Sequence, residues 1–181
     1  MAKKRKNYLL KRPANPAAFH IYIDADACPV KREIYRVAVR YWSKVFVVSN
    51  QFMRTPQEHG LDIQMIQVPS GDDQADLWIA EHIQAYDICI TSDLPLAAHC
   101  IDRKALVVSS RGRIWTQDSV GQALATRDLM SDLRSQNWGN DGVASGGPPP
   151  MTDADRSRFL NALDRLVQQS LKYHRTKPKS E

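Results

Sequence analysis

Residues 21–29 have the sequence Ile-Tyr-Ile-Asp-Ala-Asp-Ala-Cys-Pro, and this stretch decides both the fold and the candidate site. Its first three residues are typical of a buried strand, and Pro29 favours the first turn of a helix. Asp24 and Asp26 stand between them, where the chain leaves the sheet. In an open parallel sheet, ligands bind at this carboxyl end of the strands.

Two carboxylates this close repel each other unless a cation or a shared proton relieves them. Hard cations such as Mg²⁺ take oxygen ligands, often one or two carboxylates together with waters. The alternative is that Asp24 and Asp26 only cap the following helix, which is a common role of Asp. Because a cap needs one Asp, the pair favours a cation site.

The composition predicts one globular domain with charged tails. The chain has 181 residues, of which 43% are hydrophobic and 25% charged, so it can bury a sizeable core. The net charge is +5, yet residues 18–171 hold fifteen Lys and Arg against nineteen Asp and Glu, which places the basic excess at both ends. Basic tails can bind nucleic acid, but they are more often solvated extensions.

The cysteine pattern and the hydropathy predict a cytoplasmic protein. Cys28, Cys89 and Cys100 form no CxxC pair and no even-numbered framework, which favours a reducing compartment and argues against structural zinc. The charged start is not followed by an apolar signal sequence, and no apolar run approaches the roughly 18 residues of a membrane helix. We therefore expect no membrane partner.

Segments with strand periodicity alternate with segments of helical periodicity along the chain. Strands are expected at 21–23, 44–49, 63–68, 87–91 and 105–109, with a short edge strand at 114–115. Helices are expected at 30–42, 96–103, 118–135 and from 152 onward, and Ser70 or Asp72 would cap another between the third and fourth strands. This alternation predicts a three-layer α/β/α fold with a mainly parallel five-stranded sheet, ordered 3-2-1-4-5.

The expected domain organisation follows from the same pattern. It consists of a basic flexible arm at 1–18, an α/β domain at 19–136, a Gly/Pro linker at 137–151 and a C-terminal helix at 152–173 that packs on the domain.

Acidic residues follow the carboxyl ends of three predicted strands. Asp24 and Asp26 follow the first strand, Asp76 lies in the helix after the third, and Asp93 follows the fourth. Strands one and four are neighbours in the predicted order, so Asp24, Asp76 and Asp93 should converge, with carboxyl groups within roughly 8 Å. Asp76 alone has the alternative role of an acid that suits a helix N-terminus. Asp87, at the opposite end of the fourth strand, is expected to be a solvated loop residue.

This acid set predicts divalent-metal chemistry at a phosphate. Asp24, Asp76 and Asp93 are the candidate catalytic residues, and together with Asp26 they are the candidate ligands of Mg²⁺ or Mn²⁺. A metal held there would lower the pKa of a bound water and neutralise charge on a phosphate. Loops at the same end carry the candidates for binding phosphate oxygens, namely Asn50, Gln51, Arg54 and Arg111. For the two arginines, a solvated loop position is the alternative.

Seven short motifs, in this order and spacing, resemble the bacterial YaiI/YqxD family. They are Asp-Ala-Asp-Ala-Cys-Pro at 24–29, Ser-Asn-Gln at 49–51, Gly-Asp-x-x-Ala-Asp at 71–76, Thr-Ser-Asp-Leu-Pro-Leu-Ala at 91–97, Ser-Arg-Gly at 110–112, Thr-Arg-Asp-Leu-Met at 126–130 and Gly-Gly-Pro at 146–148. The resemblance extends from residue 21 to the last helix. The long basic arm, Ser92 in place of a usual Ala and Ser110 in place of a usual Pro depart from the family pattern.

The YaiI/YqxD family is similar in fold to PIN and NYN nuclease domains, where aspartates at strand ends hold Mg²⁺ or Mn²⁺ for RNA hydrolysis. The resemblance therefore implies a PIN-like domain at 19–136, a metal-dependent ribonuclease activity and RNA as the partner. It also implies that Asp24 is the strand-one acid, Asp76 the helix acid and Asp93 the strand-four acid, with Asp26 in support.

Two other functions are alternatives. Asp24-x-Asp26 at a strand end also resembles the first motif of haloacid-dehalogenase-type phosphatases, with Asp24 as nucleophile and Asp26 as acid/base. The order of the later motifs differs, however, and no Lys lies suitably between them. The third function is RNA binding without cleavage by a PIN-like body, although clustered negative charge contributes nothing to RNA binding. Cys28 is at a predicted helix N-terminus, but no Arg has the spacing of a cysteine phosphatase loop, so no role is assigned to it.

Overall fold

Strand β1 (His20–Asp24) lies in the middle of a six-stranded sheet in the computed structural model, which describes residues 18–26, 28–57, 60–71, 73–136 and 149–176. The other strands are β2 (Lys44–Ser49), β3 (Asp62–Gln67), β4 (Ile88–Ile90), β5 (Leu106–Val108) and β6 (Ile114–Trp115), in the order β3-β2-β1-β4-β5-β6. The first five are parallel, and β6 pairs antiparallel with β5. The predicted order is confirmed, and the edge strand makes the sheet six-stranded rather than five-stranded.

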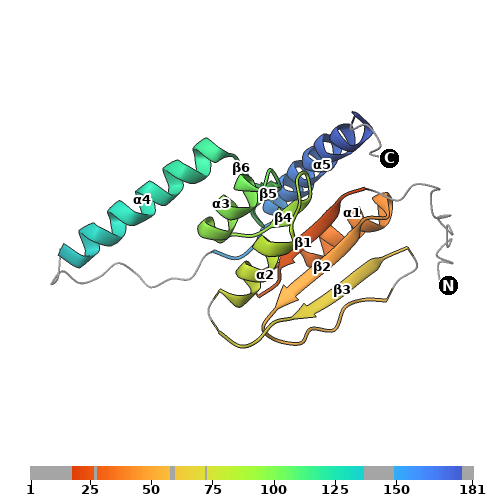
Figure 1. Cartoon of the computed structure of the whole chain (residues 1–181), viewed down its shortest axis with the longest axis horizontal. Coiled ribbons are helices and arrows are strands. Elements are labelled where there is room, and N and C mark those ends of the chain that lie inside the picture. Colours follow the sequence, from red (N-terminus) through yellow and green to blue (C-terminus); the bar gives the residue numbers. More distant parts are fainter. Residues whose placement is uncertain (1–17, 27, 58–59, 72, 137–148, 177–181) are drawn as a thin grey trace.

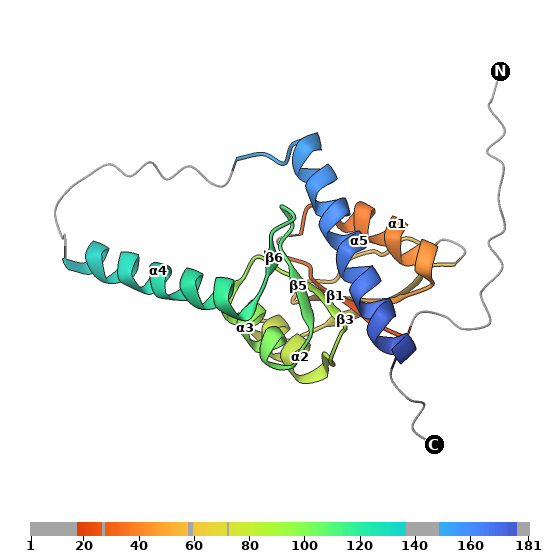
Figure 2. The same cartoon turned by 90° about the horizontal axis from the view of Figure 1, so that it is seen from above.

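Helices cover both faces of this sheet, which confirms the three-layer α/β/α arrangement (Figures 1 and 2). The helices are α1 (Lys31–Tyr41), α2 (Gln74–His82), α3 (Leu94–Asp102), α4 (Gln117–Gln136) and α5 (Asp153–Thr176). α1 and α5 pack on one face, and α2 and α3 pack on the other. Among the described residues, no helix combines the length and the apolar character that a membrane span requires.

The alternation of side chains along β1 divides the core into two parts. Ile21 and Ile23 face α1 and α5 and pack in a cluster with Phe159, whereas Tyr22 faces the opposite side and packs in a cluster with Ile79. A central parallel strand is covered on both faces, so each of its positions is better filled by an apolar side chain. This explains the uninterrupted apolar run before Asp24.

The start of α5 is fixed to the turn between β5 and β6. Thr152 and Asp155 form a capping box, in which the Asp155 N–H donates to Thr152 Oγ1 at 3.1 Å and the Thr152 N–H donates to Asp155 Oδ2 at 3.0 Å. The hydrogen bonds from Thr152 lower the pKa of the Asp155 carboxyl. Arg111 reaches from the turn to Asp155 at 3.3 Å, and Gly112 beside it has a φ of +83° and lies against the backbone of α5.

The predicted C-terminal helix therefore exists as α5 and packs on the sheet. The predicted basic arm, apart from residue 18, and most of the predicted linker, at 137–148, lie outside the described residues.

The prediction that Asp87 is a solvated loop residue is wrong. Asp87 is buried and accepts hydrogen bonds from the backbone N–H groups of His20 at 2.8 Å and Gln84 at 3.0 Å. Buried backbone N–H groups need hydrogen-bond partners, and Asp87 supplies them to the first residue of β1 and to the turn before β4. Its role is structural, at the sheet edge opposite the candidate site.

Replacing Gly112 with Ala should destabilise the fold. An added Cβ would lie 2.7 Å from backbone atoms of Arg158 and Phe159, and the positive φ disfavours any L side chain. We expect the free energy of unfolding, measured by urea denaturation, to fall by about 2 kcal/mol or more. Gly121→Ala is the matched control, because nothing lies within 4 Å of its Cβ and Ala favours a helix interior, so it should be neutral or stabilising. Equal losses from both substitutions would contradict this explanation.

Candidate functional site

An open cavity of about 290 Å³ lies at the carboxyl ends of the central strands and is called the acidic cavity below. It is lined by Asp24, Asp26, Asn50, Gly71, Asp73, Gln74, Ala75, Asp76 and Asp93. Asp24 ends β1 and Asp26 follows it, Asn50 follows β2, and Asp93 follows β4. The remaining lining residues lie at the start of α2 or just before it. β1 stands where the strand order reverses, between β2 and β4, which is the usual ligand position in such sheets.

Hydroxyl groups at the ends of two strands orient two of the carboxylates and the backbone of a third acid. Thr91, after β4, donates from Oγ1 to Asp24 Oδ2 at 3.0 Å and accepts from the Asp93 N–H at 3.0 Å. Asp93 caps α3 by accepting from the Leu96 N–H at 2.8 Å. At the end of β2, the Ser49 hydroxyl donates to Asp26 Oδ1. A carboxylate offers several acceptor positions, so each of these side chains retains capacity for a further ligand.

Burial and repulsion perturb the acids of this cavity. Burial, followed by the charges of Asp24, Asp93, Asp73 and Asp26, raises the pKa of Asp76 to about 7. Burial also raises the pKa of Asp24, against the hydrogen bond from Thr91, and the charges of Asp26 and Asp93 add to the rise. Within the described part of the chain, no Lys or Arg forms an ion pair with any of these aspartates. The cavity therefore has an uncompensated negative charge that a cation would relieve.

The carboxylate oxygens of the cavity are the kind of ligand that a hard divalent cation prefers, but the described side chains do not form a closed coordination shell. Among the described residues, no group of three or more His, Cys, Asp or Glu side chains is drawn together closely enough to hold a metal ion. The expected carboxyl spacing of roughly 8 Å therefore stays a prediction. Mg²⁺ usually keeps several waters and uses only one or two carboxylates, so a tight group of three is not a requirement for binding.

The candidate phosphate-binding residues have different positions. Asn50 lines the acidic cavity, whereas Gln51 and Arg54 are exposed on the loop after β2. Arg111 pairs with Asp155 and donates to the Pro149 carbonyl, so its guanidinium fastens the start of α5. For Arg111 the structure thus provides a structural role that the sequence did not indicate.

The polar residues that sequence reasoning missed come from the same sheet edge. Thr91 and Ser49 belong to the family motifs. Each is a polar residue at the end of a buried strand and near an acid, and this pattern could have identified them. Gly71, Asp73 and Gln74 also line the cavity. The prediction that Ser70 or Asp72 caps this helix is not confirmed: α2 begins after Asp73, which has a φ of 62° and makes no side-chain cap, and Asp72 lies outside the described residues.

The two positions that depart from the family pattern lie together beneath Asp24. The hydroxyl groups of Ser92 and Ser110 are 3.4 Å apart, and they line a void of about 10 Å³ with Asp24, Cys28 and Thr91. Such a void has room for about one water. Burial raises the pKa of the Cys28 thiol to about 11, so Cys28 is not an activated nucleophile.

Replacing Asp76 with Asn should reduce the pH dependence of stability. The folded state holds the Asp76 proton up to about pH 7, whereas an ordinary Asp loses it near 3.8, so the metal-free protein loses stability as the pH rises between these values. Asn has no such proton. In EDTA at about pH 7.5, the free energy of unfolding measured by urea denaturation should be higher for the variant than for wild type by on the order of 1 kcal/mol. This value is smaller than the full pKa shift would give, because the Asp76 side chain is partly exposed.

The control for this experiment is Asp128→Asn, which changes an exposed carboxylate on α4 and should keep the wild-type pH dependence. If Asp76→Asn also keeps the wild-type pH dependence, burial and the neighbouring carboxylates do not raise the pKa of Asp76 in solution.

The chain matches known proteins over most of its length. A family model described as "Uncharacterized BCR, YaiI/YqxD family" matches residues 22–169. A UPF0178 protein of Paramagnetospirillum magneticum is 53% identical over 150 residues, covering 83% of this chain and 95% of that protein. A UPF0178 protein of Cereibacter sphaeroides is 51% identical over 150 residues, covering 83% and 89%, and one of Rhodospirillum rubrum is 46% identical over 148 residues, covering 82% and 95%.

No solved structure matches the chain, so the expected likeness to PIN and NYN nuclease domains stays a prediction. The family match covers the sheet, the acidic cavity and most of α5. On this extent of similarity, the chain belongs to the YaiI/YqxD family.

Proposed function

We propose that this protein is a divalent-cation-dependent nuclease that hydrolyses phosphodiester bonds of RNA at the acidic cavity. The observation that supports the proposal most strongly is the set of five aspartates in one cavity, contributed by three separate segments of the chain: Asp24 and Asp26, Asp73 and Asp76, and Asp93. Burial, followed by the repulsion from the other carboxylates, raises the pKa of Asp76 to about 7, which is a cost that a purely structural role does not require.

The charge of the cavity makes a cation necessary for any phosphate ligand. A phosphodiester is itself anionic and would be repelled by Asp24, Asp26, Asp76 and Asp93. Mg²⁺ or Mn²⁺ supplies charge neutralisation at the phosphate and a more acidic bound water. The number and type of oxygen donors suit these ions better than softer metals, which prefer thiolate or imidazole.

The roles of the protein side chains follow from their contacts. The four candidate ligands named above would hold the cation, and the hydroxyl groups of Thr91 and Ser49 fix the orientation of Asp24 and Asp26. The Asn50 side chain, which lines the same cavity, can donate its amide N–H groups to phosphate oxygens.

Replacing Asp24 with Asn should separate metal binding from stability. The variant loses a charged ligand, so Mn²⁺ should raise its melting temperature less than that of wild type. Its melting temperature in EDTA should stay equal or rise, because one repulsive charge is gone. Mn²⁺-dependent cleavage of a single-stranded RNA should fall by on the order of a hundredfold or more.

Asp128→Asn is again the control and should match wild type in all three measurements. If Asp24→Asn instead lowers stability in EDTA and keeps the Mn²⁺ shift, Asp24 has only a structural role, through its hydrogen bond from Thr91, and the nuclease proposal fails. A small phosphomonoester in the same assay tests the phosphatase alternative. Hydrolysis of that compound without RNA cleavage would favour a phosphatase with Asp24 as the nucleophile.

A further inference from the structure

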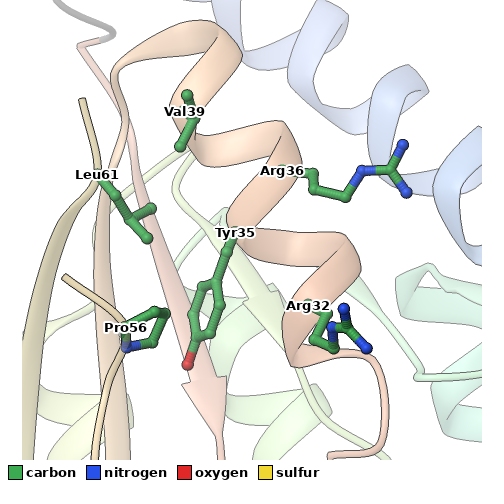
Figure 3. Close-up of a pocket in the computed structure, with 6 residues that line it drawn as sticks. All are labelled: Arg32, Tyr35, Arg36, Val39, Pro56 and Leu61. Atoms are coloured by element: carbon green, nitrogen blue, oxygen red, sulfur yellow. The ribbon is translucent and has the colours of Figure 1, made fainter. Parts of the chain in front are cut away.

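A groove of about 500 Å³ lies between α1 and the loop that joins β2 to β3 (Figure 3). It is lined by Arg32, Tyr35, Arg36, Val39, Pro56 and Leu61. Figure 3 shows the Tyr35 ring beside Pro56, with Leu61 near it, while the guanidinium groups of Arg32 and Arg36 project on the other side of α1. The groove therefore has an apolar, aromatic wall, and the two arginines that border it on α1 form a cationic rim whose guanidinium groups stand across the helix from that wall. Its volume is that of a typical ligand pocket.

The two arginines of the rim are available to an external anion. They lie four residues apart on α1 and so occupy one face of the helix. Both are exposed, and among the described residues neither forms an ion pair. In contrast, Arg156 pairs with Glu33 at 2.9 Å and Arg111 pairs with Asp155 at 3.3 Å. Guanidinium groups bind phosphate through two parallel hydrogen bonds, which makes phosphate a fitting anion here.

The segment 50–56 connects this groove to the acidic cavity. Asn50 at one end lines the acidic cavity, and Pro56 at the other end lines the groove. Between them lie Phe52, which is 69% exposed, and the exposed Arg54. An aromatic ring exposed to this extent on a loop is available for stacking on a base. Arg54 adds a third cationic side chain, on the segment that joins the groove to the acidic cavity.

The start of α1 places one end of the groove, at Arg32, toward the sheet edge that carries the acids. Lys31, the first residue of α1, donates from Nζ to the carbonyl of Ala25 at 2.6 Å, and Ala25 stands between Asp24 and Asp26. Arg32 is the next residue in the chain, so the cationic rim begins within the first turn of α1 beside the acidic turn.

We infer that the surface formed by Arg32, Tyr35, Arg36, Phe52 and Arg54, called the arginine groove, binds one strand of RNA that leads into the acidic cavity. This inference deepens the proposed function and rests on it. Single-stranded RNA combines exposed base faces, which stack on aromatic rings, with a phosphate at each step, which pairs with Arg. A nucleic-acid duplex would fit this surface less well, because its base faces are covered. An apolar protein segment would also fit less well, because it would leave the three arginines unpaired.

The test is RNA binding in EDTA, which excludes the metal and so separates binding from cleavage. A fluorescein-labelled single-stranded RNA of about ten nucleotides is titrated with the full chain, and anisotropy is recorded at several salt concentrations. The double variant Arg32→Ala/Arg36→Ala should bind about tenfold or more weakly. Its plot of log affinity against log salt should be shallower by about 1.4, since each phosphate contact on a single strand contributes about 0.7.

Two further variants sharpen the comparison. Phe52→Ala should weaken binding about tenfold with little change in the salt dependence, because stacking rather than charge is lost. The matched control, Arg127→Ala/Arg165→Ala, removes the same charge from exposed positions on α4 and α5 and should change affinity less than threefold on the same scale. This control also accounts for general attraction by the basic ends of the chain.

Several results would overturn the inference. The inference is wrong if the wild-type protein does not bind the RNA. It is also wrong if the arginine-groove variants and the control lose RNA affinity equally, or if the wild-type protein binds an RNA duplex with the same affinity. Failure of the nuclease proposal has a different signature. In that case Asp24→Asn leaves every Mn²⁺-dependent activity unchanged, while the arginine-groove variants still lose RNA affinity in EDTA.

Discussion

The repulsion among carboxylates at one sheet edge is the constraint on which the rest of this structure depends. The parallel pairing of β1 with β4 brings their carboxyl ends together, so Asp24, Asp26 and Asp93 face one cavity, to which the start of α2 adds Asp73 and Asp76. Hydrogen bonds from Thr91 and Ser49 offset part of the repulsion but add no positive charge. The apolar packing of Ile21 and Ile23 on both helices of one face must therefore hold β1 in place against it.

The features that sequence reasoning predicted correctly are those that follow from periodicity and topology. The apolar run before Asp24 identifies a strand buried on both faces, and the alternation with helices determines a parallel sheet. Once strands one and four are neighbours, Asp24 and Asp93 must share an edge, whichever side chains surround them. Their common cavity thus follows from a short chain of general rules, whereas their spacing depends on side-chain rotamers that no such rule determines.

Sequence reasoning failed where a polar residue depends on a partner far away in the chain. Asp87 and Arg111 both have the local pattern of solvated loop residues. Asp87, however, accepts a hydrogen bond from His20, 67 residues away, and Arg111 pairs with Asp155, 44 residues away. Both contacts join separate elements, so they are fixed by tertiary packing and leave no signature in neighbouring residues. The exposed Leu129 on α4 is the converse case, because helical periodicity predicts an apolar face but not whether another element covers it.

Under the proposed function, the charge distribution explains why RNA binding and cleavage would need different surfaces. Residues 18–171 carry nineteen acidic and fifteen basic side chains, so the folded body has no general attraction for a polyanion. The acidic cavity would repel RNA until a cation were bound, so it would not provide the first contact. Guanidinium groups and aromatic rings can provide it without a metal, since their interactions with phosphates and bases do not involve the carboxylates. The segment from Asn50 to Pro56 touches both surfaces, and a strand held on the arginine groove would thereby present its next phosphate to the acids rather than approach them unguided.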